Sequence, residues 1–272
     1  MQYKLICSDI DGTLLNKDRQ LSKRTIAAIM QLKNKIPVVL ISSRMPKAMQ
    51  HLQQELDIMR NPLIAFNGGL ILDYSGEKPV SLLSEEIPLR IAADIVKFNG
   101  ELSFHTSLYH NDEWYVPEMD YWANREKKTT KVEPIPADLN EVCTDWSKRN
   151  IGPHKIMCMG EAPEIDQLSE YLNANYSDQL HCYRSKDTYL EIASKKISKL
   201  SALELLLEKK YAIDLSEVIA FGDNYNDVEM INGVGHGVAM ENARDEVKAV
   251  ANQLTAKNTD DGVAMVLEAI FG

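Results

Sequence analysis

The sequence predicts an α/β protein with a Rossmann-like parallel-sheet core and a large inserted α+β domain. Short apolar runs alternate with amphipathic stretches in the first and last thirds of the chain, a pattern typical of parallel strands joined by crossover helices. Between about residues 84 and 187 the pattern changes to aromatic-rich strands mixed with helices, and this stretch contains all 3 tryptophans. We therefore expect a catalytic core of residues 1–83 plus 188–272 around an inserted domain of residues 84–187.

The N-terminal third supplies three of the expected core strands. YKLICSDI predicts a buried strand, and SKRTIAAIMQLKNK predicts a helix with Ser22 as its N-cap. PVVLISS predicts a second strand, and a helix should follow over about residues 46–56. LIAF predicts a third strand ending at residues 67–69 (Asn-Gly-Gly), with LILDYSG as its hairpin-like return. We expect the Asn-Gly-Gly segment to form a turn and part of the floor of a site.

The remaining elements follow the same reasoning. In the C-terminal third, TYLEIAS, EVIAFGD and VGHGVAM predict core strands, SKLSALELLLEKK a helix beginning at Ser198, and DGVAMVLEAIFG a closing helix. In the middle stretch, LSFHTS, HKIMCMG and LHCYRS predict strands, whereas PLRIAADIVKF and APEIDQLSEYL predict helices. The middle stretch therefore has strands and helices enough for a domain of its own.

Composition and charge favour a cytoplasmic protein. The formal net charge is -10, which disfavours nucleic acid and anionic membranes as partners. We find neither a run of about 20 apolar residues nor a signal peptide in MQYKLICSDIDG. The four cysteines and six histidines are dispersed, so we expect free thiols and no histidine metal site. We expect a monomer or weak homo-oligomer.

The sharpest motif is the pair Asp9 and Asp11, directly after the first predicted strand. Ligands of open α/β sheets bind beyond the carboxyl ends of the strands, and both aspartates fall at that edge. Gly12 permits a sharp exit into a loop. The alternative interpretation is a strand end capped by Asx turns. The presence of a second acidic group elsewhere in the chain argues against this alternative.

That second group is Gly-Asp-Asn-Tyr-Asn-Asp, with Asp223 and Asp227, at the end of the strand EVIAF. If the two strands are adjacent, their carboxylates converge and repel by about 4 kcal/mol per close pair at an intermediate dielectric. A divalent cation relieves that repulsion, and ligation by oxygen alone selects Mg²⁺ or a similar hard ion. The alternative for this group is simple N-capping of a helix.

Two further features suit an anionic substrate. Ser42 and Ser43 end the strand VVLISS just before a helix, where hydroxyl and N–H donors form a phosphate cradle. A plain strand-to-helix turn is the alternative. Lys199 lies at a predicted helix start, where a cation is poorly placed for the helix dipole. A solvated lysine is the alternative, but its position between the serines and the second acidic group favours a role in the site.

The order of these motifs resembles the haloacid dehalogenase (HAD) superfamily. DxDGTLL is followed by a strand ending in Ser-Ser-Arg, then a lysine, then GDxxND, and this covers the whole core. NGG after LIAF, LEI before the lysine, and VAMENA and DGVA near the end resemble the Cof-type subfamily of hydrolases and phosphatases, with a large inserted cap domain. The chain departs from this pattern in Ser-Ser for Thr-Gly at residues 42–43, and at three positions where glycine is common: Lys196, Leu200 and Glu241.

The resemblance implies a Mg²⁺-dependent phosphatase acting on small phosphorylated metabolites such as sugar phosphates. Asp9 would be the nucleophile that forms an aspartyl-phosphate, Asp11 the general acid and base, and Asp227 the residue that orients Lys199 or a metal-bound water. The metal would be held by Asp9, the Asp11 main chain and Asp223. Phosphate would be contacted by Ile10, Ser42, Ser43, Lys199 and Asn226.

The inserted domain would close over the site as a lid that excludes water and selects the leaving group. Arg44, His105, Tyr109 or Arg184 could touch the substrate, although each type is more often a surface or packing residue. A phosphomutase using the same aspartates is the nearest alternative function. A phospho-receiver domain is disfavoured by DxDGT, GDNYND and the insertion, and an inactive phosphate-binding module by the complete set of catalytic positions.

Overall fold

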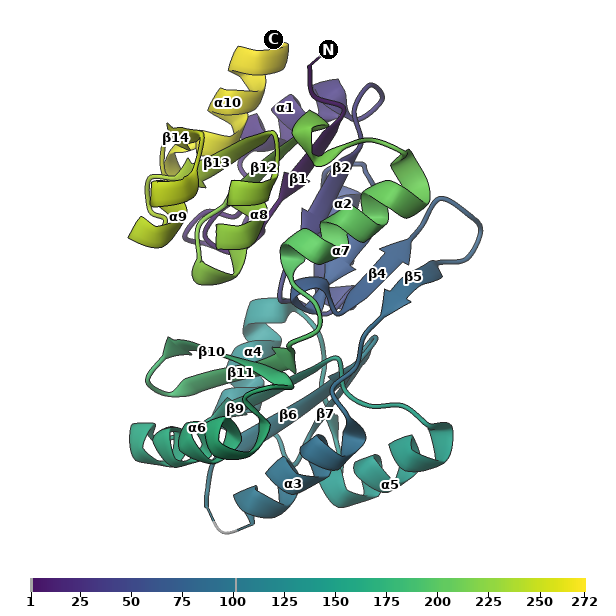
Figure 1. Cartoon of the computed structure of the whole chain (residues 1–272), viewed down its shortest axis with the longest axis vertical. Helices are drawn as coiled ribbons and strands as arrows, with labels where there is room; N and C mark the ends of the chain where they lie inside the picture. Colours follow the sequence, from purple (N-terminus) through teal and green to yellow (C-terminus); the bar gives the residue numbers. More distant parts are fainter. Residues whose placement is uncertain (1, 101) are drawn as a thin grey trace. The chain divides into compact units, whose positions relative to one another are not determined.

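The computed structural model describes residues 2–100 and 102–272 and divides the chain into two compact units. The first comprises Met1–Leu83 with Ser198–Gly272, and the second Ser84–Ile197. An eight-stranded sheet belongs to the first unit and a six-stranded sheet to the second (Figure 1). The predicted α/β fold class is confirmed.

In the first unit the strands and helices have the following bounds. The strands are β1 (Leu5–Ser8), β2 (Val38–Ile41), β3 (Leu63–Ala65), β4 (Leu70–Asp73), β5 (Val80–Ser84), β12 (Val218–Gly222), β13 (His236–Met240) and β14 (Gln253–Thr255). The helices are α1 (Lys23–Leu32), α2 (Lys47–Glu55), α7 (Lys199–Leu206), α8 (Val228–Gly233), α9 (Asp245–Val250) and α10 (Gly262–Phe271).

The eight strands lie in the order β14-β13-β12-β1-β2-β3-β4-β5. Neighbours from β14 to β3 are parallel, and β4 returns antiparallel to β3. Helices α1, α2 and α10 cover one face of the sheet, and α7, α8 and α9 cover the other (Figure 1). Because both faces are covered, β1 (LICS), β2 (VVLI) and β12 (VIAFG) are buried at every position, as expected of a parallel sheet.

Serine side chains begin two of these helices, as the sequence predicts. Ser22 accepts a hydrogen bond from the Thr25 backbone N–H at the start of α1. At the start of α7, Ser198 accepts from the Ser201 backbone N–H. Each cap satisfies a helix N–H that has no partner within the helix. The second cap fixes where α7 starts and therefore the position of Lys199, its first residue.

The second unit is built on a sheet of order β10-β11-β9-β6-β7-β8. Its strands are β6 (His105–His110), β7 (Glu113–Val116), β8 (Ile135–Pro136), β9 (Lys155–Met159), β10 (Leu180–Lys186) and β11 (Tyr189–Ser194). Its helices are α3 (Leu89–Asn99), α4 (Tyr121–Thr130), α5 (Leu139–Arg149) and α6 (Ala162–Tyr176).

The two faces of this sheet carry different side chains. Leu108, Ile156 and Ile192 form a core with residues of α3, α5 and α6. Side chains of alternate residues in a strand point to opposite faces, so Tyr189 of β11 lies on the other face, where its ring meets that of Trp122 in α4. Helix α4 therefore covers the face opposite the core helices.

One strand lies in a different sheet from the one that the sequence suggested. We expected TYLEIAS in the catalytic core, yet β11 pairs antiparallel with both β9 and β10 of the second sheet. Its apolar alternation, Leu190 and Ile192, points into the second core, and residues 188–197 group with the second unit. The strand was recognisable from its sequence, but its pairing partners were not.

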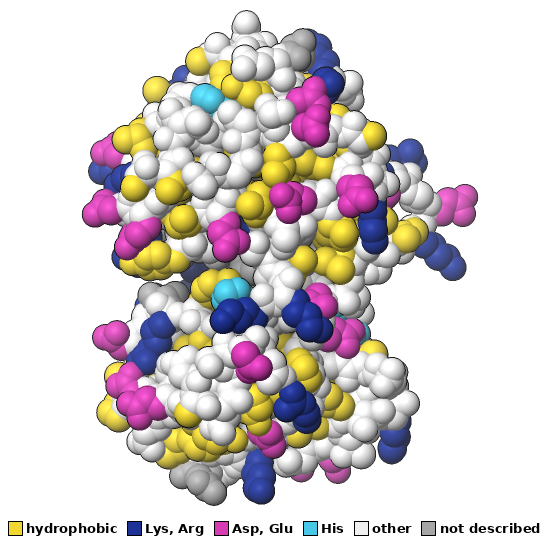
Figure 2. Space-filling model, in the orientation of Figure 1, with side chains coloured by type: hydrophobic (Ala, Val, Ile, Leu, Met, Phe, Trp, Pro, Cys, Tyr) yellow, Lys and Arg dark blue, Asp and Glu magenta, His cyan; other side chains and the backbone are white. Residues whose placement is uncertain are grey.

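Acidic and basic side chains alternate over the face of the molecule drawn in Figure 2, with small apolar patches between them. This mixture is typical of ordinary protein surfaces. No helix in the described part of the chain combines the length and apolar character needed to cross a bilayer.

Candidate active site

Four adjacent parallel strands of the first unit end at the same edge of its sheet. In their order across the sheet, the strands β12, β1 and β2 are followed directly by Asp223, Asp9 and Ser42, and Asn67 is the second residue after β3. The register pairs Ser8 with Phe221 and with Leu40. The residues that follow these strands therefore gather at one edge, where open α/β sheets bind ligands.

Close backbone approach brings the first two acidic segments together. The Asp9 N–H donates to the Phe221 carbonyl at 3.0 Å, and Thr13 Oγ1 donates to Asp223 Oδ1 at 2.9 Å. Gly12 has φ +88°, and a Cβ there would lie 2.3 Å from an Asp223 carboxylate oxygen. Glycine is therefore required at this position both for backbone conformation and for space.

The carboxylates surround one buried lysine. Lys199 Nζ donates to Asp9 Oδ1 and to Asp227 Oδ1, each at 2.6 Å, and its side chain is 0% exposed. Oxygens of Asp9, Asp223 and Asp227 lie within 4.8 Å of one another. The one ammonium group thus bonds to two of the three carboxylates, so its single positive charge cannot neutralise all three.

The pKa values reflect this imbalance. Burial raises the pKa of Asp9 well above its ordinary value, an effect that Lys199 opposes and Asp227 reinforces. Burial and then the charge of Asp227 raise the pKa of Asp223 to about 7. Burial alone would lower the pKa of Lys199, but Asp227 and Asp9 outweigh it and raise that pKa. Lys199 therefore stays charged, while the carboxylates repel one another.

Asp227 is held from two sides. Its Oδ1 accepts from Lys199, and its Oδ2 accepts from the backbone N–H groups of Asp223 at 2.9 Å and Asn224 at 3.0 Å. A Cβ on Gly222 would lie 2.6 Å from the Asp227 Cβ, so the turn is tightly packed. Asp227 thereby fixes both Lys199 and the loop that carries Asp223.

The donor chemistry fits a hard divalent cation. The candidate side-chain ligands, Asp9, Asp223 and Asp227, all offer carboxylate oxygens, the type that Mg²⁺ prefers, and three carboxylates outnumber the one ammonium group of Lys199. Because both oxygens of Asp227 already accept hydrogen bonds, the oxygens of Asp9 and Asp223 are the better placed to bind an ion. The Asp227 side chain is better suited to positioning its neighbours.

Asp11 is held by arginines. Arg44 donates to both of its carboxylate oxygens at 2.7 Å, and Arg19 donates to Oδ1 at 3.2 Å. Burial alone would raise the pKa of Asp11, but the hydrogen bonds and charge of Arg44, with help from Arg19, lower it below the ordinary value. The Asp11 side chain remains 41% exposed, so it has room to turn.

Arg44 lies in the candidate site through its bonds to Asp11, whereas from the sequence we expected a surface or packing residue. Its side chain is 6% exposed, and besides Asp11 it donates to the Ala48 carbonyl at 3.3 Å. The available signal was its place, directly after Ser-Ser at a strand end on the ligand-binding edge. An arginine at such an edge can reach the acidic group after the neighbouring strand.

The expected phosphate contacts lie at the same edge. Ser42 is buried, and its Oγ accepts from the Arg44 backbone N–H at 3.3 Å. Ser43 is half-buried beside it, and Ile10 is fully buried. Asn226, also half-buried, donates from Nδ2 to Asn67 Oδ1 at 2.8 Å.

The replacements of common glycines are accommodated locally. The Leu200 side chain fills the space above Gly233, where a Cβ would lie 2.8 Å from it. Lys196 lies on the surface of the second unit and pairs with Glu85 at 3.0 Å. Glu241 is exposed and pairs with Lys257 at 3.7 Å. None of the three side chains needs to enter the acidic cluster.

Three residues that we considered for substrate contact lie in the second unit. His105 bonds to Asp120 and to Ser107, each at 2.8 Å. Tyr109 stacks on Trp114 with ring centroids 5.5 Å apart. Arg184 pairs with Asp166 at 2.6 Å. Each of these side chains thus contacts others of its own unit.

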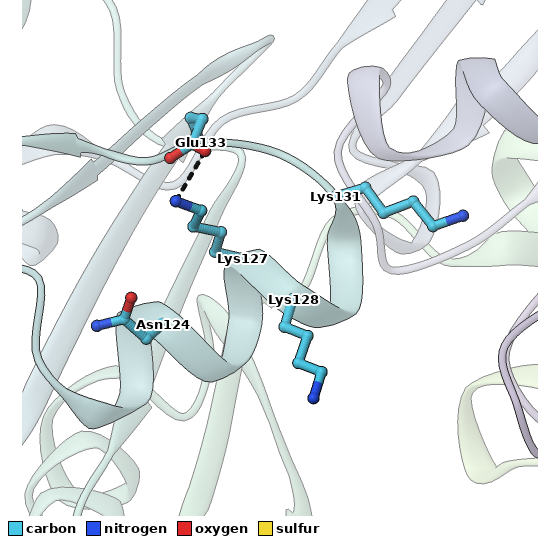
Figure 3. A pocket seen from close by; sticks show the side chains of 5 residues that line it. All are labelled: Asn124, Lys127, Lys128, Lys131 and Glu133. Atoms are coloured by element: carbon cyan, nitrogen blue, oxygen red, sulfur yellow. Dashed lines mark ion pairs between the residues drawn. The ribbon is translucent and has the colours of Figure 1, made fainter.

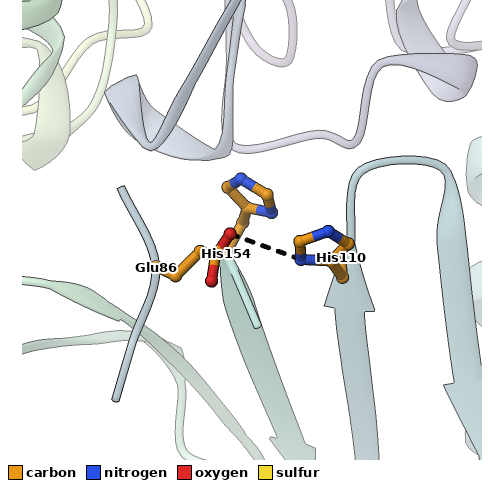
Figure 4. A group of neighbouring side chains, drawn as sticks. All are labelled: Glu86, His110 and His154. Carbon is orange, nitrogen blue, oxygen red and sulfur yellow. Dashed lines mark ion pairs between the residues drawn. The ribbon is translucent and has the colours of Figure 1, made fainter. Parts of the chain in front are cut away.

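A second group with metal-ligating side chains was not expected. Ligand atoms of Glu86, His110 and His154 lie within 4.8 Å of one another (Figure 4). Glu86 accepts from the Gly152 N–H at 2.6 Å, His110 Nδ1 lies 2.7 Å from the Gly152 carbonyl, and His154 Nε2 lies 3.0 Å from Ser84 Oγ. The remaining ring nitrogens contact Asn111. Hydrogen bonds therefore satisfy this group without an ion.

A hollow of about 360 Å³ beside α4 is lined by Asn124, Lys127, Lys128, Lys131 and Glu133 (Figure 3). Lys127 pairs with Glu133 at 2.8 Å. The lysines occupy the last turn of α4 and its C-cap, where cations stabilise the negative end of the helix dipole. Stabilisation of the helix therefore explains why these lysines are here, without a ligand in the hollow.

Comparison with known proteins gives consistent matches over almost the whole chain. A family model for haloacid dehalogenase-like hydrolases matches residues 6–267. A Haemophilus influenzae protein named "Putative phosphatase" is 38% identical over 100% of this chain and 99% of its own. "Pyridoxal phosphate phosphatase YbhA" of Escherichia coli is 26% identical over 98% of both chains.

Solved structures match equally fully. The crystal structure of a Thermotoga maritima protein is 31% identical, with a TM-score of 0.87 over 99% of this chain and 98% of that one. A haloacid dehalogenase-like hydrolase from Bacteroides thetaiotaomicron is 28% identical, with a TM-score of 0.89 over 99% of this chain and 100% of that one. These similarities span both units.

Proposed function

Since the chain belongs to the haloacid dehalogenase-like hydrolase family, we propose that it is a Mg²⁺-dependent phosphatase that uses Asp9 as its nucleophile. The observation that carries the proposal is the buried cluster in which Lys199 Nζ lies 2.6 Å from both Asp9 and Asp227. Asp223 is the third acid, and the cluster retains excess negative charge. A site of this kind suits a cation and the phosphoryl group that the cation would bind.

In the proposed first step, a carboxylate oxygen of Asp9 attacks the phosphorus of the substrate, and the bond from phosphorus to the alcohol oxygen breaks. An aspartyl-phosphate remains, and Asp11 gives its proton to the departing oxygen. Lys199 donates to Asp9 Oδ1, which holds the carboxylate and leaves Oδ2 for the attack. Splitting one hard displacement into two easier ones is the benefit of a covalent intermediate.

In the second step, Asp11 takes a proton from water, and the water oxygen attacks the phosphorus. Phosphate leaves and Asp9 is regenerated. The arginines lower the pKa of Asp11, so Asp11 must turn away from Arg44 and come near the negative phosphoryl group before it holds a proton. We therefore assign Arg44 to the resting position of Asp11.

Asp9, Asp223 and the main chain of Asp11 would hold the ion. When bound, Mg²⁺ would neutralise charge on the transferring phosphoryl group. Ser42, Ser43, Asn226, Ile10 and Lys199 lie at the same edge as candidates to hold the phosphoryl oxygens. Placing positive charge and N–H donors at that position is the main requirement of phosphoryl transfer.

We infer that the substrates are small phosphorylated metabolites and that the second unit, Ser84–Ile197, is the cap that selects among them; it extends the expected cap of residues 84–187 by the segment that contains β11. Named relatives support this class, including "5-amino-6-(5-phospho-D-ribitylamino)uracil phosphatase YitU" of Bacillus subtilis, 27% identical over 98% of this chain. The four cysteines are free thiols, which agrees with a cytoplasmic location. We propose no nucleic-acid or membrane partner and a monomeric or weakly self-associating chain.

The test is a panel of phosphorylated metabolites assayed with Mg²⁺ and with chelator, using wild type and Asp9→Asn. We expect Asp9→Asn to lower kcat at least about a thousandfold, because the amide is a poor nucleophile, while the circular dichroism spectrum stays unchanged. Asp18→Asn, in an exposed turn, is the matched control. Near-wild-type, metal-dependent turnover by Asp9→Asn would remove Asp9 from the role.

A further inference from the structure

We propose that Asn67 is a positioning residue that fixes the carboxamide of Asn226 for the phosphoryl group; this rests on the proposed phosphatase function. Asn67 follows β3, the fourth strand that ends at the site, and its side chain reaches a residue 159 positions later in the chain. Sequence reasoning placed it only in a turn or on the floor of the site.

The backbone around Asn67 is held in an unfavourable conformation. Phe66, Asn67 and Gly68 have φ values of +53°, +57° and +109°. Such angles cost about 1–3 kcal/mol each for residues other than glycine, although Asn tolerates them better than most. The surrounding structure must therefore impose the conformation.

Contacts with two other parts of the site impose it. The Phe66 N–H donates to the Arg44 carbonyl at 3.1 Å, and the Asn67 N–H donates to the Ser42 carbonyl at 2.9 Å. A Cβ on Gly68 would lie 2.5 Å from the Ser198 carbonyl oxygen. Residues 66–68 thus pack between the turn that carries Ser42 and the cap residue that precedes Lys199.

The Asn67 side chain then makes the contact on which the inference depends. Asn67 is 4% exposed, and its Oδ1 accepts one N–H of Asn226 at 2.8 Å. A carboxamide nitrogen has two hydrogens, so the other remains for a phosphoryl oxygen. With its first hydrogen held, Asn226 presents the nitrogen and not the oxygen of its amide to an anion.

A purely structural role for Asn67 predicts a different outcome. If the residue only shaped the turn, glycine would replace it at little cost, since glycine adopts positive φ freely. If Asn67 orients Asn226, glycine keeps the backbone but frees the amide to rotate. Substitution by glycine therefore separates the two roles.

The experiment measures binding of inorganic phosphate, as a competitive inhibitor and by calorimetry, to the Mg²⁺-loaded full chain. We expect Asn67→Gly to weaken phosphate binding about tenfold, the size of one hydrogen bond, and to raise KM more than it lowers kcat. Asn226→Ala should weaken binding at least as much. The double variant should match Asn226→Ala within about twofold, because the two residues act as one unit.

Asn150→Gly is the matched control, since Asn150 also has a positive φ, +54°, at the end of α5 in the second unit. It should bind phosphate like wild type. Asn67→Asp supplies a second variant should Asn67→Gly fail to fold: it keeps the acceptor but adds a negative charge beside the anion, so phosphate binding should weaken further.

Two results would overturn the inference while leaving the proposed function intact. The first is phosphate binding unchanged within about twofold in a folded Asn67→Gly or Asn67→Asp. The second is effects of Asn67→Gly and Asn226→Ala that multiply in the double variant, as for independent residues. A wild-type protein that neither hydrolyses phosphate esters nor binds phosphate would overturn the proposed function, and the inference with it.

Discussion

Each of two clusters in this molecule has three potential metal-ligating side chains within 4.8 Å of one another. The two clusters differ in whether the charges of their side chains repel one another. In the first unit Asp9, Asp223 and Asp227 surround one lysine, and in the second Glu86 lies with two histidines. In the histidine cluster, hydrogen bonds to backbone and side-chain groups satisfy the potential ligand atoms. In the acidic cluster Asp9 and Asp227 are buried, Asp223 is half-buried, and three carboxyl groups lie beside one ammonium group.

The difference teaches that electrostatic repulsion among the ligands, and not their proximity alone, distinguishes the proposed active site from the histidine cluster. Burial and the neighbouring charge of His110 lower the pKa of His154 to about 3, so His154 is neutral near pH 7. By contrast, burial raises the pKa of Asp9 and of Asp223. A folded chain retains such a cluster of repelling acids when another partner relieves the repulsion.

The largest stability effect should come from removing the lysine of the acidic cluster. Lys199→Met leaves buried carboxylates without their counter-charge and should lower the free energy of unfolding by about 3–5 kcal/mol. Lys155→Met is the matched control, because Lys155 is also buried but lies farther, 3.9 Å, from the acid it pairs with, Glu191. Urea unfolding at pH 7 measures both, and an equal loss in the two variants would contradict the comparison.

Metal binding should distinguish the clusters next. Mg²⁺ at about 100 times its Kd should stabilise the wild type by about 2.7 kcal/mol, because the ion relieves repulsion that exists only in the folded chain. His110→Gln should keep this stabilisation, while Asp223→Asn should lose most of it. Thermal unfolding with and without Mg²⁺ gives the comparison; stabilisation that survives Asp223→Asn would place the ion elsewhere.

The smallest of these effects is a pH dependence in the histidine cluster. The pKa of His154 is lowered from 6.5 to about 3, so below pH 6.5 the unfolded chain gains a proton that the folded chain does not. Its contribution to stability is complete above pH 6.5 and is lost as the pH falls toward 3, by about 2 kcal/mol at pH 5. His154→Gln should lose less stability than wild type between pH 7 and pH 5 in urea unfolding. Identical losses would show that His154 does not titrate this way.

The sequence predicted the strands and helices of the core well, because the signals are local. Apolar runs such as LICS and VVLI are buried at every position, and Ser22 and Ser198 cap their helices. It failed for β11, which pairs with β9 and β10 of the second sheet. An apolar strand pattern states that a face is buried, but not which sheet buries it.

By itself, the sequence determined that aspartates follow two buried strands, and the strand-end rule then predicted that they meet. Only the tertiary structure decided how the other side chains join them. Arg44 binds Asp11 across 33 residues of sequence, and Asn226 binds Asn67 across 159. These contacts depend on strand order, on register and on a backbone held at positive φ. The physical reason is that a hydrogen bond requires its donor–acceptor distance to lie within a range of a few tenths of an ångström. Only the packed fold positions distant residues that precisely.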